Sequence, residues 1–358
     1  MKMKENGRQP LQSVPMARPQ TLPRTSPKKT TASDVAARVG VSKWTVSRAF
    51  SDGASIAPDV RERVLQVAAE MGYSPNLLAR SLSTRSTRLV ALVVDELGNP
   101  NQLVMINEAT RQLQARGFSS LLLNLSPEYG AGAALRLADQ FQVDGIMFMG
   151  TSLDQELIEL AQKIRRIPLV VVSRNSSLAN IPYVTTDGYA AGAEIADLFL
   201  AEGYRRIGHM AGPESDRTEL RRLDGFRDRL QARGVALDCV LKAPHYRRDE
   251  GMQSLLRYLG ATPRAQRIEA LFCESDILAL GALDALTSMG ARQRIAIVGF
   301  DDIEIASAPA YALTTFRQPT DYLVAEAIRR LLEPDSVAQQ SLMAPGTLVL
   351  RSSHHRLA

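Results

Sequence analysis

Short aliphatic runs alternate with longer amphipathic stretches between residues 88 and 302, and this alternation limits the possible folds more than any other feature. Continuous aliphatic runs are typical of strands buried on both faces of a parallel sheet. The predicted strands are RLVALVVD (88–95), SSLLLNL (119–125), VDGIMFMG (143–150), IPLVVVS (167–173), RRIGHMAG (205–212), residues 234–241, IEALFCES (268–275) and RIAIVGFDD (294–302). The stretches between them predict helices at 102–116, 130–141, 154–165, 189–202, 219–233, 250–259 and 276–289. We therefore expect two doubly wound parallel sheets in succession.

Polar residues at the ends of these strands indicate a ligand site. Ligands of doubly wound folds bind beyond the carboxyl ends of the strands, and with two lobes the natural place is the cleft between them. Arg222 in RRLDGF lies in the first turns of a predicted helix, and strands end at Asp95, Arg174, Asp301 and Asp302. An Arg and an Asp facing one cavity suit polyhydroxylated or carboxylated molecules. A structural ion pair between Arg222 and Asp301 stays open as the alternative.

The N-terminal quarter of the chain is basic, unlike the remainder. Residues 1–88 contain 15 Lys and Arg against 6 Asp and Glu, a formal charge of +9, and the remaining residues carry −4. This asymmetry indicates a polyanionic partner for the N-terminal part; a solvated basic tail without a partner is the alternative. Residues 1–29 contain five prolines and are predicted to be a disordered arm.

The stretch TASDVAARVGVSKWTVSRAF predicts a helix-turn-helix. Thr31 or Ser33 suits the cap of a first helix, Gly40 suits the turn, and Ser42 suits the cap of a second helix. Val46 would pack inward on the first helix, so Lys43, Trp44, Ser47 and Arg48 would face outward, where they can enter a major groove. Ser42, Thr45 and Ser47 suit phosphate contacts. The alternative is a surface helix with Trp44 packed on a neighbouring domain.

A third helix and a short basic segment follow. DVRERVLQVAAEMG has apolar residues at helical spacing, and Pro58 suits its first turn. The segment after it, YSPNLLARSLSTRSTR, has three leucines among arginines, and Asn76 suits the position of its helix cap. About eight helical residues without a core are only marginally stable alone.

These motifs, together with IVGFDD, resemble the LacI/GalR family of bacterial transcription regulators from about residue 30 to the C-terminus. The resemblance implies an N-terminal all-α helix-turn-helix domain and a periplasmic-binding-protein-like core of two lobes. It also implies three crossovers between the lobes, the last near residues 314–319. The expected divisions are the arm (1–29), the DNA-binding domain (30–74), the hinge helix (75–87), the N-terminal lobe (88–184 and 316–331) and the C-terminal lobe (185–315 and 332–358).

The resemblance also implies roles for single residues. Lys43 and Trp44 would choose the operator, with Arg48 reaching the groove. The hinge helix would lie in the minor groove, where Leu82, with Ala79 beside it, would open the central base step. The implied DNA-binding residues are Ser42, Lys43, Trp44, Thr45, Ser47, Arg48, Asn76, Ala79 and Leu82.

For the effector, the family's R-x-x-G-F and G-[FY]-D-D motifs match Arg222 and Asp301. Where the family often has N-P-F-F, this chain has Asn99-Pro100-Asn101-Gln102. Ser275 stands where the family frequently has Asn. The missing aromatic wall favours a polar effector over a purine. The expected effector-binding residues are Asp95, Gln102, Arg174, Arg222, Ser275 and Asp301.

Other chemistry is sparse in this sequence. It has no phosphate-binding loop, nucleophile elbow or H-E-x-x-H motif, so we expect no enzyme, no cofactor and no metal. Cys239 and Cys273 fit no metal spacing, and the histidine pair at 354–355 is expected to be solvated. Without a secretory leader or a membrane span, the expected location is the cytoplasm. Without leucine heptads at the C-terminus, we expect a homodimer.

We therefore predict a dimeric, sequence-specific transcriptional regulator, a repressor, that binds a pseudo-palindromic operator in double-stranded DNA. A sugar, sugar acid or sugar phosphate between the lobes would control its affinity. Two alternatives stay open. A solute-binding module predicts a leader and no helix-turn-helix. A sugar-metabolising α/β enzyme predicts a catalytic base, and turnover assays would detect it.

Overall fold

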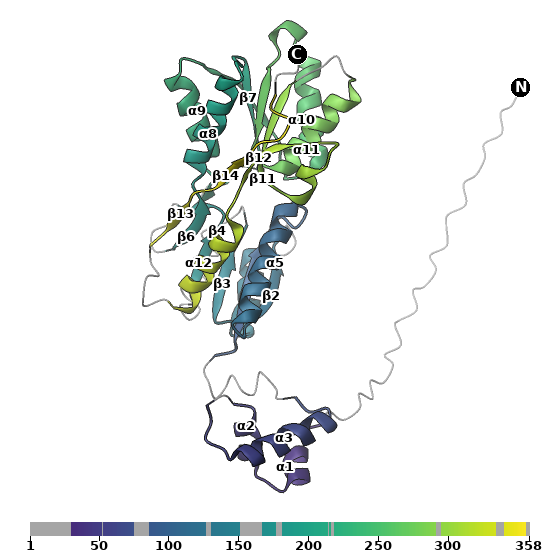
Figure 1. Cartoon of the computed structure of the whole chain (residues 1–358), viewed down its shortest axis with the longest axis vertical. Helices are drawn as coiled ribbons and strands as arrows, with labels where there is room; N and C mark the ends of the chain where they lie inside the picture. The colour runs from purple at the N-terminus through teal and green to yellow at the C-terminus, as the bar shows by residue number, and fades with distance from the viewer. Residues whose placement is uncertain are drawn as a thin grey trace, which may run out of the picture. The chain divides into compact units, whose positions relative to one another are not determined.

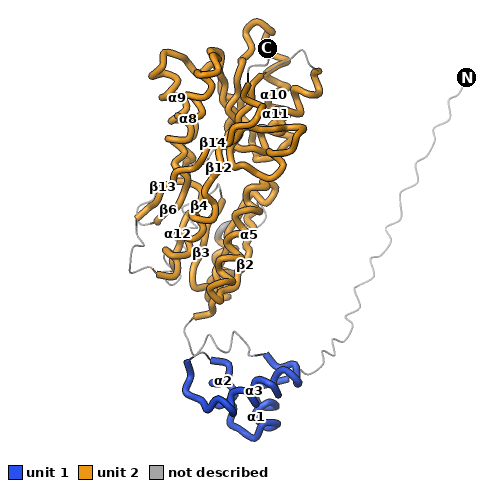
Figure 2. The backbone as a smooth tube through the Cα atoms, viewed as in Figure 1, with its two compact units in different colours: residues 1–80 blue, residues 81–358 orange. Residues whose placement is uncertain are grey.

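The structure is a computed structural model that describes residues 30–51, 53–74, 86–126, 130–150, 167–176, 181–213, 215, 218–290, 295–333 and 340–355. The chain divides into two compact units, residues 1–80 and residues 81–358, which are coloured separately in Figure 2. The predicted arm (1–29), most of the predicted hinge (75–85) and the predicted helix at 154–165 lie outside the described residues.

The first unit is a three-helix domain. Its helices are α1 (Ala32–Val39), α2 (Lys43–Ala49) and α3 (Pro58–Glu70). Each helix contributes two buried side chains to a small shared core, which consists of Val35, Ala36, Val46, Ala49, Val64 and Ala68. Phe50 and Tyr73 close this core with an edge-to-face contact at 5.7 Å between ring centroids. The predicted helix-turn-helix and third helix are therefore present.

The second unit contains two α/β lobes (Figure 1). The first lobe has a parallel sheet in the order β13-β6-β4-β3-β1-β2. Its strands are β1 (Leu89–Val94), β2 (Ser119–Asn124), β3 (Gly145–Phe148), β4 (Leu169–Val172), β6 (Tyr183–Thr186) and β13 (Leu342–Ala344). Alternate side chains of the strands serve two cores, because successive residues of a strand point to opposite faces. Helices α5 (Pro100–Ala115) and α12 (Thr320–Leu332) cover one face, and α6 (Ala131–Gln140) covers the other.

The second lobe repeats this plan with a sheet in the order β14-β12-β11-β10-β7-β9. Its strands are β7 (Ile207–Ala211), β9 (Leu237–Lys242), β10 (Ala270–Cys273), β11 (Ala296–Asp301), β12 (Thr314–Arg317) and β14 (Thr347–Val349). All pairs are parallel except β12 with β14, which departs from the predicted parallel sheet. Helices α8 (Gly188–Ala201) and α9 (Arg222–Ala232) cover one face, and α10 (Arg248–Ala261) and α11 (Asp276–Ser288) the other (Figure 1).

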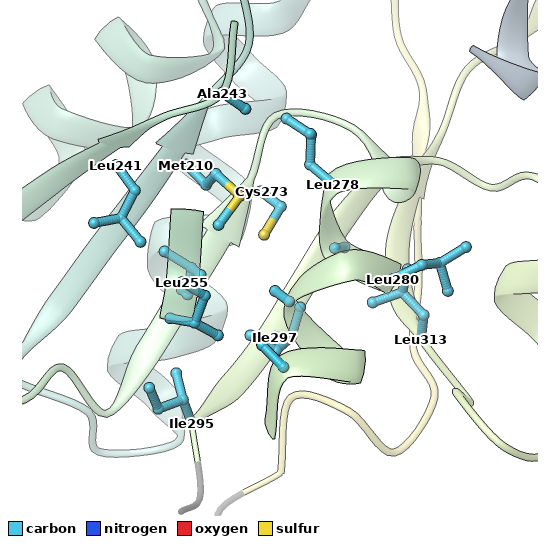
Figure 3. Close-up of a cluster of buried hydrophobic side chains, with 14 of the residues drawn as sticks. Met210, Leu241, Ala243, Leu255, Cys273, Leu278, Leu280, Ile295, Ile297 and Leu313 are labelled. Carbon is cyan, nitrogen blue, oxygen red and sulfur yellow. The ribbon is translucent and has the colours of Figure 1, made fainter. Parts of the chain in front are cut away.

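The core under α10 and α11 is built mainly from aliphatic and sulfur-containing side chains (Figure 3). Leu255 and Leu278 from the helices meet Met210, Leu271 and Ile297 from the strands, and each is fully buried. Cys273 is also fully buried, and burial raises the pKa of its thiol well above the ordinary value. This cysteine is therefore a small core residue rather than a nucleophile.

Three connections between described strands and helices pass from one sheet to the other. They follow β6, β12 and β13, because α8 belongs to the second lobe, α12 to the first and β14 to the second. The prediction that the last crossover lies near residues 314–319 is therefore wrong; the last follows Ala344. The assignment of all of 332–358 to the C-terminal lobe fails for the same reason, since β13 pairs with β6 in the first sheet.

Candidate functional site

The turn between α1 and α2 is fixed by local hydrogen bonds. Thr31, not Ser33, caps α1 in a reciprocal arrangement: its backbone N–H donates to Asp34 Oδ2 at 2.8 Å, and its hydroxyl accepts from the Asp34 N–H. Gly40 ends α1 in the left-handed conformation, with φ of 78°. Ser42 then caps α2 by accepting the Thr45 N–H at 3.1 Å. The second helix therefore begins where the sequence predicted.

The outer face of α2 presents an unusual aromatic surface. Val46 and Ala49 are buried on the inner face, whereas the Trp44 side chain is 67% exposed. The Arg48 guanidinium lies over the Trp44 ring, with Cζ 4.1 Å from the ring centroid. This cation–π contact holds a planar apolar surface beside a positive charge, which suits contact with a base or a sugar-phosphate backbone.

The remaining predicted DNA-binding residues differ in their exposure, and three of them lie outside the described residues. Ser42, Lys43 and Ser47 are exposed on the same helix. Thr45 is half-buried, and its hydroxyl lies 2.9 Å from that of Ser42, so part of its hydrogen-bonding capacity is used locally. The predicted hinge residues Asn76, Ala79 and Leu82 lie outside the described residues.

In each lobe, the predicted effector residues lie at the ends of strands or at the starts of helices. In the first lobe, Asp95 follows β1 and Arg174 follows β4, while Gln102 lies in the first turn of α5. The Gln102 side-chain amide donates to the Met149 carbonyl, and a Cβ added at the adjacent Gly150 would lie 2.9 Å from the Asp95 carboxyl. The structure therefore brings Asp95 and Gln102 to the same end of β3.

In the second lobe, Arg222 is almost fully buried at the start of α9. Its Nη1 donates to the Glu274 carbonyl, and its guanidinium lies over the Phe300 ring with Cζ 3.4 Å from the centroid. Burial lowers the pKa of this guanidinium, while the charge of Asp301 acts in the opposite direction. Because its described partners are a carbonyl and an aromatic face, the alternative of a direct Arg222–Asp301 ion pair is not what the structure has.

Asp301 occupies a strained and buried position at the end of β11. Its φ is 119°, a backbone conformation that L-residues rarely adopt. Its Oδ1 accepts the Gln318 side-chain amide at 2.7 Å, and Gln318 in turn accepts the Thr186 hydroxyl at 2.9 Å. Burial raises the pKa of Asp301, Arg222 lowers it, and the nearby Asp276 raises it again. Such strain and desolvation are concentrated at binding sites.

Asp302 and Ser275, two further residues predicted for the ligand site, differ in whether their polar atoms already have partners. The sequence places Asp302 at the cleft, but its carboxylate binds Arg317 at 2.6 Å and Arg351 at 2.6 Å, so it ties β12 and the C-terminal segment together. Ser275 precedes α11 and is 2% exposed, and its hydroxyl has no hydrogen-bond partner among the described residues. Of the two, only Ser275 therefore offers a free polar atom.

A polar network that the sequence did not predict joins the two lobes through Tyr246. The Tyr246 hydroxyl accepts from Arg174 Nη2 of the first lobe at 3.0 Å, and it donates to the Glu274 carboxylate of its own lobe. The Tyr246 N–H donates to Glu96 Oε2 of the first lobe at 3.2 Å. The ring lies against Gly212, where an added Cβ would be 2.3 Å from it. One tyrosine therefore connects the two lobes.

The pKa values of the two glutamates in this network are shifted in opposite directions. Burial and the charge of Asp95 raise the pKa of Glu96 to about 7. Burial also acts to raise the pKa of Glu274, but interactions with His209, Tyr246 and Arg174 outweigh it and lower the pKa to about 2. Glu274 is therefore charged near neutral pH, and Glu96 is in an environment that resists its charge.

A short antiparallel ribbon crosses between the lobes beside this network. Strand β5 (Asn175–Ser176) directly follows Arg174 in the first lobe, and it pairs with β8 (Thr218–Glu219), which precedes α9 in the second lobe. The ribbon therefore links the segments that carry Arg174 and Arg222.

Comparison with known proteins places both units. Residues 31–76 match the family described as bacterial regulatory proteins, lacI family, and residues 196–354 match the periplasmic binding protein-like domain. The chain is similar to the HTH-type transcriptional regulator CelR of Thermobifida fusca, with 31% identity over 313 residues, 84% of this chain and 90% of that protein. It is also similar to the HTH-type transcriptional repressor PurR of Edwardsiella ictaluri, with 30% identity over 308 residues, 85% of this chain and 89% of that protein.

Two solved structures are also similar to this chain. A complex of the transcriptional regulator CelR with cellobiose is 28% identical, covers 90% of this chain and 99% of its own, and has a TM-score of 0.67. A lac repressor dimer bound to operator and an anti-inducer is 23% identical, covers 92% of this chain and all of its own, and shows the same fold with a TM-score of 0.80. Within the described residues, no helix is both long and apolar enough to cross a membrane.

Proposed function

The chain belongs to the LacI family of bacterial regulatory proteins, and from this we propose a dimeric, sequence-specific DNA-binding transcriptional regulator that acts as a repressor. Its operator affinity is controlled by a small polar effector bound between the two lobes. The observation that carries the proposal is the pairing of an exposed, capped recognition helix in one unit with a polar interlobe site in the other.

The DNA-binding role rests on the outer face of α2. Lys43 suits the acceptor atoms of guanine, and Trp44 with Arg48 suits a thymine methyl or the backbone. Ser42, Thr45 and Ser47 at the start of the helix suit phosphate contacts, which set the register without reading sequence. We propose that Asn76, Ala79 and Leu82 act with them in the minor groove.

The effector role rests on the polar groups that converge between the lobes. We propose that Asp95, Gln102 and Arg174 contact the effector from the first lobe, and Arg222, Ser275 and Asp301 from the second. Carboxylates accept hydroxyl hydrogens, and arginine donates to hydroxyl, carboxylate or phosphate oxygens. The first turn of α5, Asn99-Pro100-Asn101-Gln102, offers no aromatic ring for stacking. A sugar, sugar acid or sugar phosphate fits these groups better than a purine.

Control follows from a shift between populations of the molecule. An effector that prefers one arrangement of the lobes favours that arrangement by its difference in affinity. In a dimer, the arrangement sets the separation of the two hinge segments and so the fit of two helix-turn-helix heads to half-sites about 34 Å apart. A change from mostly bound to mostly free requires about 10⁴-fold differential affinity, about 5.5 kcal/mol.

The relatives named above are regulators rather than enzymes. We propose that this chain has no catalytic activity either, because its sequence has none of the catalytic motifs considered above and Asp302, the carboxylate next to Asp301, is used in two ion pairs. The absence of a membrane-spanning helix in the described residues fits a protein that meets DNA in the cytoplasm.

Thermal denaturation with a panel of sugars, sugar acids and sugar phosphates tests the effector role. A ligand at 100 times its Kd adds about 2.7 kcal/mol to the free energy of unfolding. The compound that stabilises the wild-type protein should alter its operator affinity. Arg222→Ala should retain operator binding and lose the response. An unchanged effector affinity in Arg222→Ala, measured by calorimetry, would show that the pocket is misplaced.

A further inference from the structure

Three side chains of types that bind metal ions meet near the C-terminus. They are Glu202, which follows α8, and His354 and His355, which follow β14. One ligand atom of each lies within 4.8 Å of the others. We propose that these three residues bind a divalent transition-metal ion that favours imidazole ligands, such as Zn²⁺ or Ni²⁺.

His354 is held as a metal-binding histidine usually is. The residue is 2% exposed, against the prediction that the pair is solvated. Its Nδ1 lies 2.7 Å from the Thr314 hydroxyl, and its backbone carbonyl accepts the Tyr204 hydroxyl at 3.0 Å. Metal-bound histidines characteristically use their other ring nitrogen in this way, which fixes the ring. One nitrogen of the His354 ring lies within 4.8 Å of the ligand atoms of His355 and Glu202, so the buried ring faces the other two side chains.

His355 brings a second imidazole to the same point. The centroids of the two histidine rings are 4.0 Å apart, and the ring planes meet at 40°. His355 Nδ1 lies 3.6 Å from Glu202 Oε2, which is longer than a good hydrogen bond. The side chain of His355 is 56% exposed, so an ion can reach the group from solvent. A cation among the three groups would replace this loose contact with coordinate bonds.

The donor set decides the class of ion. Two imidazoles and one carboxylate are typical ligands of Zn²⁺, Ni²⁺, Cu²⁺ and Fe²⁺, whereas Mg²⁺ and Ca²⁺ prefer oxygen ligands alone. Three protein ligands leave a further position for water. The site would therefore be an open one of moderate affinity.

The proposed metal site is separate from the effector cleft. Helix α8 begins beside the segment that carries Arg222, since a Cβ at Gly188 would lie 1.9 Å from the Leu220 carbonyl. Glu202 follows the other end of this 14-residue helix, a distance of about 20 Å along its axis. A bound ion would join the end of α8 to the C-terminal segment and stabilise the second lobe without contacting the effector.

Titration calorimetry of the untagged full-length protein with NiCl₂ and ZnCl₂ tests this proposal. The wild-type protein should bind one ion with a Kd on the order of micromolar. His355→Ala and Glu202→Gln should each weaken binding by more than about tenfold, the loss seen even for an outer partner of a metal ligand. His245→Ala is the matched control, because His245 is exposed and far along the chain from this group, and its affinity should equal that of the wild type.

A thermal shift provides a second measurement. The ion should raise the Tm of the wild-type protein and of His245→Ala, and EDTA should reverse the rise. Equal binding by His355→Ala and the wild type would overturn the proposal, since the ion would then be held elsewhere, for example by the Cys239 thiol. The absence of any binding to the wild-type protein below about 100 μM, roughly −5.5 kcal/mol, would overturn it as well.

Discussion

The hydroxyl of Tyr246 in the second lobe lies 3.0 Å from the Arg174 guanidinium in the first. The same hydroxyl donates to Glu274, and the backbone N–H of Tyr246 donates to Glu96. Because Arg174 and Glu96 belong to the first lobe and Tyr246 belongs to the second, these two hydrogen bonds stabilise the approach of the two lobes. Any effector that enters the cleft must either accommodate this network or replace it.

Tyr246→Phe should weaken the closed arrangement. The substitution removes the hydroxyl and leaves buried polar groups of Arg174 and Glu274 unsatisfied, which costs about 1–3 kcal/mol in free energy of unfolding. Urea denaturation measures this loss, and small-angle X-ray scattering of the effector-free protein should show a larger radius of gyration. Tyr311→Phe is the control, since the Tyr311 hydroxyl bonds to Arg248 and Asp284 within the second lobe. An identical scattering curve for Tyr246→Phe and Tyr311→Phe would contradict the role of Tyr246 between the lobes.

Glu96→Gln should change how stability depends on pH. The pKa of Glu96 is raised on folding from 4.5 to about 7, so its contribution favours the folded state below pH 4.5 and is lost as pH rises through about 7. Replacement by Gln removes this contribution, while Asp276 and Asp301 still titrate in both proteins. The Tm of Glu96→Gln relative to the wild type should therefore be higher at pH 8 than at pH 5. A difference in Tm that is constant from pH 5 to pH 8 would argue against this environment for Glu96.

Gly225→Ala should destabilise the second lobe, although alanine usually favours a helix over glycine. Helices α8 and α9 approach closely through glycines: a Cβ at Gly225 would lie 1.9 Å from the Tyr189 carbonyl, and one at Gly192 would lie 2.1 Å from that of Arg222. Relief of such a clash requires backbone movement, with a cost of about 1–3 kcal/mol or more. Chemical denaturation measures this loss of stability. Because Arg222 is the first residue of α9, its side chain should move with the helix.

Gly260→Ala is the matched control for that substitution. Gly260 also lies in a helix, but an added Cβ there would meet nothing within 4 Å. Its replacement should leave stability unchanged or raise it by up to about 1 kcal/mol. If both alanine variants were equally stable, close packing of α8 on α9 would not explain the glycine of the RRLDGF motif.

The DNA-binding unit was predictable because its determinants are local. Ser42 and Gly40 act on residues within four positions of themselves, so the cap and the turn could be recognised directly. The choice between Thr31 and Ser33 as the first cap needed the structure, which shows the reciprocal bonds with Asp34. The strands of both sheets were similarly recognisable, because burial on both faces leaves continuous aliphatic runs.

The network between the lobes could not be predicted for the opposite reason. Glu96 and Tyr246 are 150 positions apart, and only the closure of two separately folded sheets brings them together. The three-residue strands β13 and β14 were missed because so short a run carries no periodic signal, and with them the last crossover. His354 looked solvated beside exposed neighbours, yet the turn after β14 places its ring against Thr314.

Substitutions on the outer face of α2 should separate base recognition from phosphate contact. Lys43→Ala and Trp44→Ala should lower the preference for operator over random duplex by about 1–3 kcal/mol, because they remove groups that meet base edges. Ser47→Ala should weaken both duplexes alike, since a phosphate contact carries no sequence information. Fluorescence anisotropy with both duplexes measures the ratio. Equal losses on the two duplexes for all three variants would count against this orientation of the helix.

Selection of binding sites from a pool of random double-stranded DNA tests the central claim most directly. The full-length protein should enrich a pseudo-palindromic sequence, and the logarithm of its affinity for that sequence should fall linearly with the logarithm of the salt concentration. Failure to retain any duplex, even at low salt and with or without the stabilising small molecules, would contradict the assignment of this chain as a DNA-binding regulator.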